Sequence, residues 1–379
     1  MIYLADKNEC TGCTACENIC PKKCITMKED VEGFLQPKID YTNCIECRLC
    51  ISTCPVLQHK TETKNKKTQL YAAYAKSKEI LNISSSGGIF PIISKFVLEQ
   101  NGVVYGATML PDGEVSHIKV ENTNDLYNIV GSKYVQSNLH NTFSQIKEDL
   151  DKNIFVLFCG SPCQVIGLLN YLKKDYSNLF TIDFVCHGVP SPKAWRYYLK
   201  ENKIKNIMNV NFREKQNGWE NFNLKINCKD KTLLESKEIN IFMKSFLHNL
   251  NLRKCCYQCK SRGINRNSDI TLGDLWGCKE IVPNFYNKDG VSLMMIHSDK
   301  GLYLFDSIRN DIVQLKLNNI DSIIKNNPSI INDTKKNKYR DIFLKQINEH
   351  NYGYLVNKYT KITLMQKIKY KFNYYLKRR

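Results

Sequence analysis

Eight of the 17 cysteines form two runs with identical spacing, and thiols spaced in this way are ligands for metal clusters. The runs are Cys10, Cys13, Cys16 and Cys20, then, 34 residues later, Cys44, Cys47, Cys50 and Cys54. A proline follows each run, at Pro21 and Pro55. The repeated C-x2-C-x2-C-x3-C-P pattern predicts two [4Fe-4S] clusters, because three close thiolates bind one cube and the fourth reaches the other.

The expected ligands are therefore exchanged between the runs. One cluster is assigned to Cys10, Cys13, Cys16 and Cys54, and the other to Cys44, Cys47, Cys50 and Cys20. Zinc is the alternative metal, since two C-x2-C pairs can build a tetrahedral site, but eight cysteines in two equal runs exceed that need. Residues 1–57 resemble a two-cluster bacterial ferredoxin, which implies the transfer of single electrons. Cys24 lies outside the pattern and is expected to be a small buried residue.

The other cysteines are scattered. Cys163 and Cys186 stand beside short polar motifs, and Cys256 and Cys259 form one C-x2-C pair. Spacing alone does not join them into a site. Seventeen cysteines in a chain without an export signal favour metal ligands over disulfides.

Length and composition limit the class of protein. A chain of 379 residues with 42% hydrophobic and 24% charged residues fits two or three globular domains. The longest apolar run, Ile154 to Cys159, is far shorter than the roughly 18 to 20 residues of a membrane span. Asp6 and Glu9 lie where a secretory signal would be basic and apolar, so a cytoplasmic location is expected.

The formal charge of +18 would favour a nucleic-acid or acidic-membrane partner. Each four-iron cluster nets about −2 with its thiolates, so bound clusters would reduce that charge, and three of them would bring it to roughly +12. No recognised nucleic-acid reader motif accompanies the basic residues, so nucleic acid is not an expected partner.

The elements that must position these residues follow from hydrophobic patterning. Residues 58–69 carry no large apolar side chain and are expected to be a linker. After it, strands are expected at Leu70–Ala75, Val103–Thr108, Ile154–Cys159 and Leu179–Val185. Apolar residues from Ile89 to Val97 and from Val165 to Leu172 have helical spacing. The pattern predicts an α/β or mixed α+β body with helices covering a sheet.

Two predicted strand-to-helix turns are rich in small residues. Ser84–Gly88 precedes the helix that begins near Ile89, and Cys159–Pro162 follows the Ile154 strand. Such turns can direct free backbone N–H groups at an anion such as a pyrophosphate. The alternative is that they are ordinary helix caps with glycine at a tight turn.

Five short motifs in sequence order identify a family. They are Ser85–Phe90 (SSGGIF), Gly131–Ser137 (GSKYVQS), Gly160–Gln164 (GSPCQ), Cys186–Ser191 (CHGVPS) and Ser268–Gly277 (SDITLGDLWG). Together they resemble the coenzyme F420 hydrogenase/dehydrogenase beta-subunit family over roughly residues 68 to 300. The resemblance implies an FAD and a third [4Fe-4S] cluster in the body, with a pocket where a substrate exchanges hydride with the flavin.

The resemblance also implies site residues. The third cluster is assigned to Cys163, Cys186, Cys256 and Cys259, with Cys255 and Cys159 as alternative ligands. The FAD is assigned to Ser85, Ser86, Gly87, Gly88, Lys133, Tyr134, Gly160, Ser161, Gln164, His187 and Asp274. Lys133 could instead be a solvated lysine, His187 a structural hydrogen-bonding residue, and Asp274 the end of a buried strand. Cys228 and Cys278 are expected to be structural.

The C-terminal residues from Tyr354 to Arg379 carry eight basic and no acidic side chains, with apolar residues at helical spacing. This pattern predicts a basic amphipathic helix. It would pack on the body, lie on an anionic membrane surface, or dock an acidic redox partner.

The domains expected are a ferredoxin domain at 1–57, a linker at 58–69, a flavin and iron-sulfur body at 70–335 and a basic helical segment at 336–379. The fold class expected is α+β, with a mixed α/β flavin-binding body. The function expected is an oxidoreductase that exchanges hydride between coenzyme F420 and FAD and relays single electrons to or from a protein partner. The alternatives are an electron-transfer adaptor without turnover, a reductase of another conjugated or carbonyl substrate, and a regulatory iron-sulfur protein.

Overall fold

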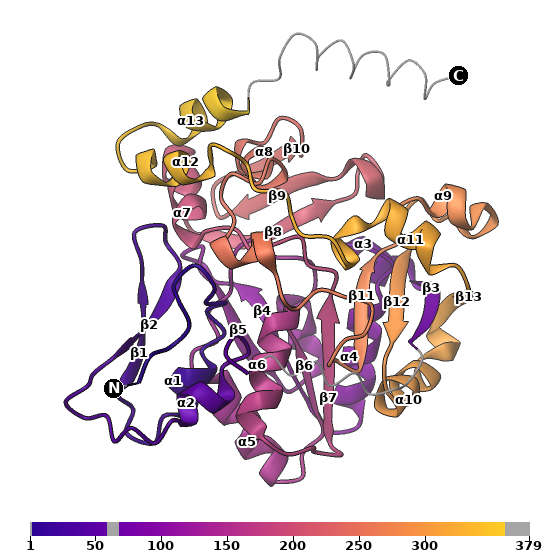
Figure 1. Ribbon diagram of the computed structural model, residues 1–379. Helices are drawn as coiled ribbons and strands as arrows, with labels where there is room; N and C mark the ends of the chain where they lie inside the picture. The colour runs from indigo at the N-terminus through magenta and orange to yellow at the C-terminus, as the bar shows by residue number, and fades with distance from the viewer. Residues whose placement is uncertain (1, 59–67, 361–379) are drawn as a thin grey trace.

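The computed structural model describes residues 2–58 and 68–360 and shows an N-terminal unit packed against a larger body (Figure 1). The N-terminal unit holds two short helices and one antiparallel hairpin: α1 (Ala15–Ile19), β1 (Ile25–Glu29), β2 (Leu35–Ile39) and α2 (Leu49–Thr53). Both helices pack on α6 (Pro162–Leu172) of the body.

The cysteine repeat is also a repeat of backbone conformation. Gly12 and Glu46, 34 residues apart, both have positive φ, at 69° and 54°. Thr14 and Arg48, at the same separation, both have a φ of 61° and precede α1 and α2. Non-glycine residues adopt this left-handed conformation at a cost, so its recurrence at three of these positions indicates that the cysteine turns impose it.

The body is built on an eight-stranded mixed sheet with the order β13-β3-β12-β11-β7-β6-β4-β5. Its strands are β3 (Gln69–Ala75), β4 (Val103–Met109), β5 (Val115–Val120), β6 (Val156–Cys159), β7 (Leu179–Phe184), β11 (Ile270–Asp274), β12 (Ser292–Ile296) and β13 (Ile312–Leu317). The central strands β11, β7, β6 and β4 are parallel, and the flanking pairs are antiparallel. Parallel strands are buried on both faces, which explains the unbroken apolar run that ends at Cys159.

Helices cover both faces of this sheet (Figure 1). One face packs on α3 (Lys78–Ile83), α4 (Ile89–Glu99) and α10 (Asp299–Ser307). The other packs on α5 (Thr142–Asp151), α6 and, beside β3 and β12, α11 (Ile320–Asn326). Alternate side chains enter the two cores: Leu70 and Ala72 face one, Tyr71 and Ala73 the other.

A second core lies around an antiparallel sheet with the order β10-β9-β8. The elements are β8 (Ile207–Glu214), β9 (Asn223–Cys228) and β10 (Thr232–Ser236), with α7 (Pro192–Glu201), α8 (Ile241–Leu247), α12 (Arg340–Gln346) and α13 (Tyr352–Tyr359) packed around them. The short helix α9 (Cys278–Ile281) and six 3-10 turns complete the described part: Thr123–Asn128, Trp219–Asn221, Lys254–Gln258, Pro283–Phe285, Arg309–Asp311 and Pro328–Ile330.

The structure confirms the mixed α/β architecture, the predicted strands and the two predicted helices, with small shifts of their ends. Gln69, the last residue of the predicted linker, pairs with Ile296 in the sheet. Residues 59–67 of that linker lie outside the described residues.

Of the predicted C-terminal helix, the described part is included in α13, and residues 361–379 lie outside the described residues. Leu355 and Val356 are fully buried in the second core, so this part packs on the body. Among the residues that the structure describes, no helix is both long enough and apolar enough to cross a membrane.

Candidate redox site

The N-terminal thiols lie in two groups that exchange their fourth members. Cys13 and Cys16 interact electrostatically with Cys10 and with Cys54 from the second run. Cys50 interacts with Cys47 and with Cys20 from the first run. The backbone N–H of Gly12 also donates to Cys10 Sγ at 3.4 Å, as amides do to cluster sulfurs. Burial raises the pKa of Cys13 to about 12, a cost to the bare thiolate that metal binding offsets.

A third group of thiols forms in the body. Cys163 interacts with Cys259, Cys186 and Cys256, and Cys186 interacts with both of the last two. Cys163 stands at the start of α6, while Cys186 follows β7 and the C-x2-C pair lies in the turn after α8. Burial raises the pKa of Cys163 and that of Cys186, the latter to about 12. The fold thus gathers four thiols from three segments.

The two alternative ligands, Cys159 and Cys255, have different neighbours. The Cys159 thiol interacts with Asp183 and Lys133, and burial raises its pKa to about 12. Cys255 is hydrogen-bonded to its neighbour Cys256, whose sulfur also accepts the Val189 N–H at 3.5 Å. Cys228 and Cys278 are buried in separate apolar cores, as the sequence predicted for structural residues.

Within residues 2–58 and 68–360, no three His, Cys, Asp or Glu side chains are grouped closely enough to hold a single metal ion. A four-iron cube holds its ligands farther apart, because each thiolate binds a different iron. The electrostatic neighbours of Cys13, Cys50 and Cys163, one thiol from each group, are all thiols, and soft thiolates are the ligands that such clusters use. The donor sets therefore fit four-iron clusters.

A cavity of about 580 Å³ lies beside the body thiols. Its volume is within the range of sites that bind small molecules and cofactors. Cys163 and Cys186 line one part of it, and Thr11 from the first cysteine run lines another. Every residue assigned from sequence to the flavin lines this cavity, apart from Gly87.

The serine- and glycine-rich turn shapes one wall. Gly88 has a φ of 79° and precedes α4 without a side-chain cap, so the first N–H groups of that 11-residue helix remain available. A Cβ on Gly87 would lie 2.4 Å from the Ala73 carbonyl oxygen, which requires glycine there. The Ser85 hydroxyl accepts the Ser132 N–H at 2.7 Å and joins this turn to the Lys133 motif.

Lys133 is partly buried on the cavity wall and is not a solvated lysine. Its Nζ donates to the Val130 carbonyl at 2.9 Å, and burial lowers its pKa to about 7. Tyr134 stacks on Phe246, with ring centroids 4.8 Å apart, and its hydroxyl accepts from Arg213 at 3.3 Å. Lys133 and Tyr134 thus give the cavity a cationic group and an aromatic wall.

Other predicted residues have internal partners as well. Gln164 Oε1 accepts the Ser161 N–H at 2.8 Å, so this glutamine caps α6 beside Gly160. His187 Nε2 lies 2.6 Å from Asn249 Oδ1, and burial lowers the His187 pKa. Both side chains therefore have a structural role while lining the cavity.

Sequence reasoning assigned Asp274 to the site but missed Arg213 and Lys237, the other charged residues of this part of the cavity. Asp274 is ion-paired with Arg213 at 2.9 Å and accepts from Trp219 Nε1 at 2.7 Å. Arg213 lies in β8, and its guanidinium packs 4.2 Å from the Phe222 ring. Lys237 lines the same region. Arg213 stands in a segment for which no strand was predicted, so no signal in the sequence specifies a ligand there.

Two buried nitrogens of the cavity wall have no hydrogen-bond partner among the described residues. They are Arg213 Nε and His117 Nδ1. Buried polar atoms are normally paired, so these two are available to a bound molecule. With a free helix start, a lysine and an aromatic wall, the cavity offers what a dinucleotide such as FAD requires.

Two repeated thiol sets on a hairpin unit, joined to a mixed α/β body, define an iron-sulfur electron-transfer protein. Comparison with known proteins supports this class and matches two segments of the chain to family models. Residues 9–57 are a 4Fe-4S dicluster domain, which confirms the predicted ferredoxin domain and its iron-sulfur clusters. Residues 155–322 match the family model for the C terminus of the coenzyme F420 hydrogenase/dehydrogenase beta subunit, the family that the five sequence motifs resemble.

Two curated relatives match the cysteine-rich region. NADH-quinone oxidoreductase subunit I 2 of Geobacter metallireducens is 40% identical over 55 residues, and subunit I of Pelobacter propionicus is 35% identical over 57 residues. Each match covers 13% of this chain, and 42% and 31% of the relatives. The chain thus spans less than half of the curated relatives that it matches.

A solved structure of the F420-reducing [NiFe] hydrogenase complex from Methanosarcina barkeri contains a similar chain. The likeness covers 70% of this chain and 89% of that one, at 15% identity and a TM-score of 0.47. A likeness at that level does not show the activity or the partners of this chain.

Proposed function

We propose that this protein is an FAD- and iron-sulfur-dependent oxidoreductase that exchanges hydride with a small conjugated substrate such as coenzyme F420. The observation that carries the proposal is the cavity of about 580 Å³. Residues of the SSGGIF, GSKYVQS and GSPCQ motifs line it together with Cys163 and Cys186. FAD can carry one or two electrons, so when bound it couples hydride exchange to single-electron carriers.

The residues of the cavity have distinct tasks in this proposal. The start of α4 and Lys133 bind the diphosphate, because free N–H groups and a cation stabilise negative charge. Tyr134 and Trp276 provide flat surfaces, and the Trp276 ring is held by Trp219, stacked at 5.0 Å and 5°. Asp274 orients Arg213 and so directs the unpaired Nε at the bound molecule.

Cys163, Cys186, Cys256 and Cys259 hold the third [4Fe-4S] cluster in this proposal. Their role is supported by the mutual contacts of the four thiols and by the position of two of them on the cavity wall. His187 and the Val189 amide position the loop that carries Cys186, since the amide donates to Cys256 Sγ and His187 binds Asn249.

The ferredoxin domain provides the connection to a protein redox partner. Cys47 is exposed, as is Ile45 beside it, so the second thiol group lies near the protein surface. A partner that docks there would come close to this group. Peripheral membrane contact through residues 361–379 stays a prediction.

Anaerobic mixing with reduced coenzyme F420 tests this function. The expected result is bleaching of a bound flavin near 1:1 stoichiometry, with the same bleaching much reduced in Asp274→Asn. Lys147→Met, an exposed substitution on α5, is the matched control. Bleaching by another hydride donor but not by reduced F420 would identify a different substrate. A chain that binds no flavin would instead be an electron-transfer adaptor.

A further inference from the structure

A buried arginine of the body is bonded to the first cysteine turn. The Arg253 side chain is almost fully buried, and its Nε donates to the Cys10 carbonyl at 2.7 Å. Its Nη2 donates to the Leu35 carbonyl at 2.9 Å, and its Nη1 to Gln136 Oε1 at 3.0 Å. The guanidinium thus touches the ferredoxin domain on both its cluster turn and its hairpin.

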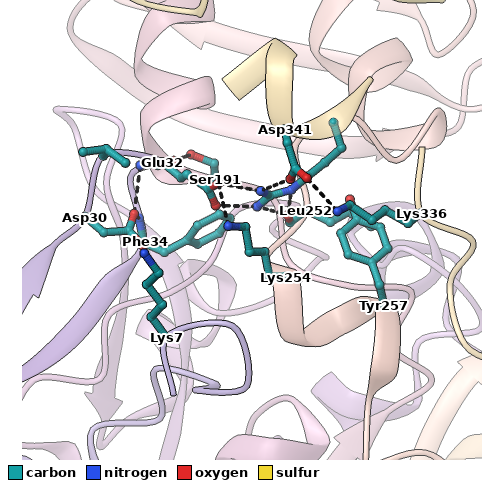
Figure 2. A network of polar contacts seen from close by, with 12 residues as sticks. Lys7, Asp30, Glu32, Phe34, Ser191, Leu252, Lys254, Tyr257, Lys336 and Asp341 are labelled. Atoms are coloured by element: carbon teal, nitrogen blue, oxygen red, sulfur yellow. Dashed lines mark hydrogen bonds and ion pairs between the residues drawn. The ribbon is translucent and has the colours of Figure 1, made fainter. Parts of the chain in front are cut away.

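The first cysteine turn is shaped to receive this arginine. Gly12 has a φ of 69°, and a Cβ there would lie 2.7 Å from Arg253 Nη1. The guanidinium therefore occupies the space that a side chain at position 12 would fill. It also packs 5.3 Å from the Phe34 ring. The neighbouring Lys254 lies 3.4 Å from Glu32 in the hairpin (Figure 2).

The backbone of Arg253 also contacts the segment that carries the body thiols. The Cys256 N–H donates to the Arg253 carbonyl at 3.0 Å, within one short 3-10 turn. The same residue therefore contacts Cys10 through its side chain and Cys256 through its backbone. One fixed positive charge lies between the first ferredoxin group and the body group.

A second contact brings the same two groups together. A Cβ on Gly167 in α6 would lie 3.0 Å from Cys13 Sγ, so the bare backbone allows that sulfur to approach the helix. Cys163 lies four residues earlier on α6, one turn or about 6 Å along the axis, on the same face. Cys13 therefore lies roughly one helical turn from a body cysteine.

The two ferredoxin groups are placed differently. Thr11, inside the first run, lines the body cavity, whereas Cys47 in the second group is exposed. The first group, Cys10, Cys13, Cys16 and Cys54, faces the body, and the second approaches solvent. A pseudo-symmetric sequence repeat thus lies in an asymmetric environment.

We infer that Arg253 and Gly167 are positioning residues that couple the first ferredoxin cluster to the body, and that the buried Arg253 charge raises the reduction potential of that cluster above that of its twin. Reduction adds one electron, and therefore one negative charge, to a cluster. A permanent cation in a low-dielectric environment stabilises that charge. The coupling to the body thiols rests on the proposed function, whereas the potential difference depends only on Arg253 and the two clusters of the ferredoxin domain.

The test is an anaerobic dithionite titration followed by electron paramagnetic resonance, which reads the clusters themselves. In Arg253→Met, we expect the midpoint potential of one ferredoxin cluster to become more negative while that of its twin in the same domain stays unchanged. Arg253→Lys should keep most of the original potential because it keeps the charge. Arg196→Met is the matched control. Arg196 is also an arginine of the body that contacts the ferredoxin domain, but its ion pair with Glu29, at 2.5 Å, is exposed. Equal potentials in the unaltered chain and Arg253→Met would overturn the inference.

If Arg253→Met loses iron, a second variant, Gly167→Ala, still tests the inference. The added methyl group must displace Cys13 by a few tenths of an ångström, so the spectrum of one cluster alone should change. Gly353→Ala, a helical glycine whose Cβ would meet only the Asn351 side chain at 3.3 Å, is its control. Unchanged spectra in Gly167→Ala would contradict the inference.

Failure of the proposed function gives a different result. A chain without flavin or a third cluster would disprove that function, yet it would still show the shifted potential in Arg253→Met. Normal flavin and a third cluster with unshifted ferredoxin potentials would disprove only the present inference.

Discussion

Arg340 and Glu32, 308 residues apart, form a two-pronged ion pair between helix α12 and the ferredoxin hairpin, with both N···O distances at 2.6 Å. The Arg340 side chain is fully buried, and it also donates to the Leu252 carbonyl next to Arg253. One arginine thus holds the hairpin, the turn before the body cysteines and α12 together. Planar paired hydrogen bonds of this kind fix orientation as well as distance.

Glu32→Ala should strongly destabilise the folded chain. Removing one partner of a buried pair leaves an uncompensated charge, at a cost of about 3 to 5 kcal/mol. The measurement is the temperature at which anaerobic protein loses its cluster absorbance. Glu29→Ala is the control, because its partner Arg196 is exposed and such pairs contribute about 0 to 1 kcal/mol. An equal effect of the two substitutions would show that the buried pair does not hold the domains together.

Cys256→Ser should remove about four irons per chain, and Cys255→Ser should remove none. The reason is that Cys163 and Cys186 both interact with Cys256, whose sulfur also accepts an amide hydrogen bond. Iron and acid-labile sulfide analysis distinguishes the two variants. Iron loss in Cys255→Ser alone would assign the ligand to the other cysteine.

Flavin binding should weaken as pH rises through about 7. Burial lowers the Lys133 pKa to about 7, so the unliganded chain carries this charge below that pH and loses it above. A diphosphate binds the protonated amine and raises its pKa, which moves the loss in the complex to higher pH. Lys133→Met should bind FAD roughly tenfold more weakly at pH 6 and show little further loss at pH 9. Fluorescence titration measures this affinity, and an unchanged pH profile in Lys133→Met would exclude the lysine as its cause.

Cys24→Ala should keep both ferredoxin clusters. Cys24 Sγ lies 3.4 Å from Cys20 Sγ, yet the repeat supplies four other thiols to that group. Anaerobic protein should still contain about eight irons in its ferredoxin domain. Loss of about four irons would instead make Cys24 a ligand.

The ferredoxin domain could be predicted from sequence because its ligands are local. Three cysteines within seven residues specify a tight turn, and the matching φ angles of Thr14 and Arg48 show that the turn follows from the repeat. The central strands were equally accessible, since buried parallel strands are continuous apolar runs. Patterning therefore predicted local geometry well.

The charged part of the cavity could not be predicted, because it depends on contacts between distant elements. Arg213 of the three-stranded sheet reaches Asp274 at the end of β11, 61 residues later. Neither residue belongs to a local pattern that specifies the other. Lys133 shows the same limit: its motif leaves open a solvated or a buried position, and only the packed cavity wall lowers its pKa.

The most direct test of the account is the content of iron, acid-labile sulfide and flavin in protein purified without oxygen. Three clusters and one cofactor predict about twelve irons and one FAD per chain. About eight irons and no flavin would contradict the account, because only the ferredoxin domain would then carry redox groups.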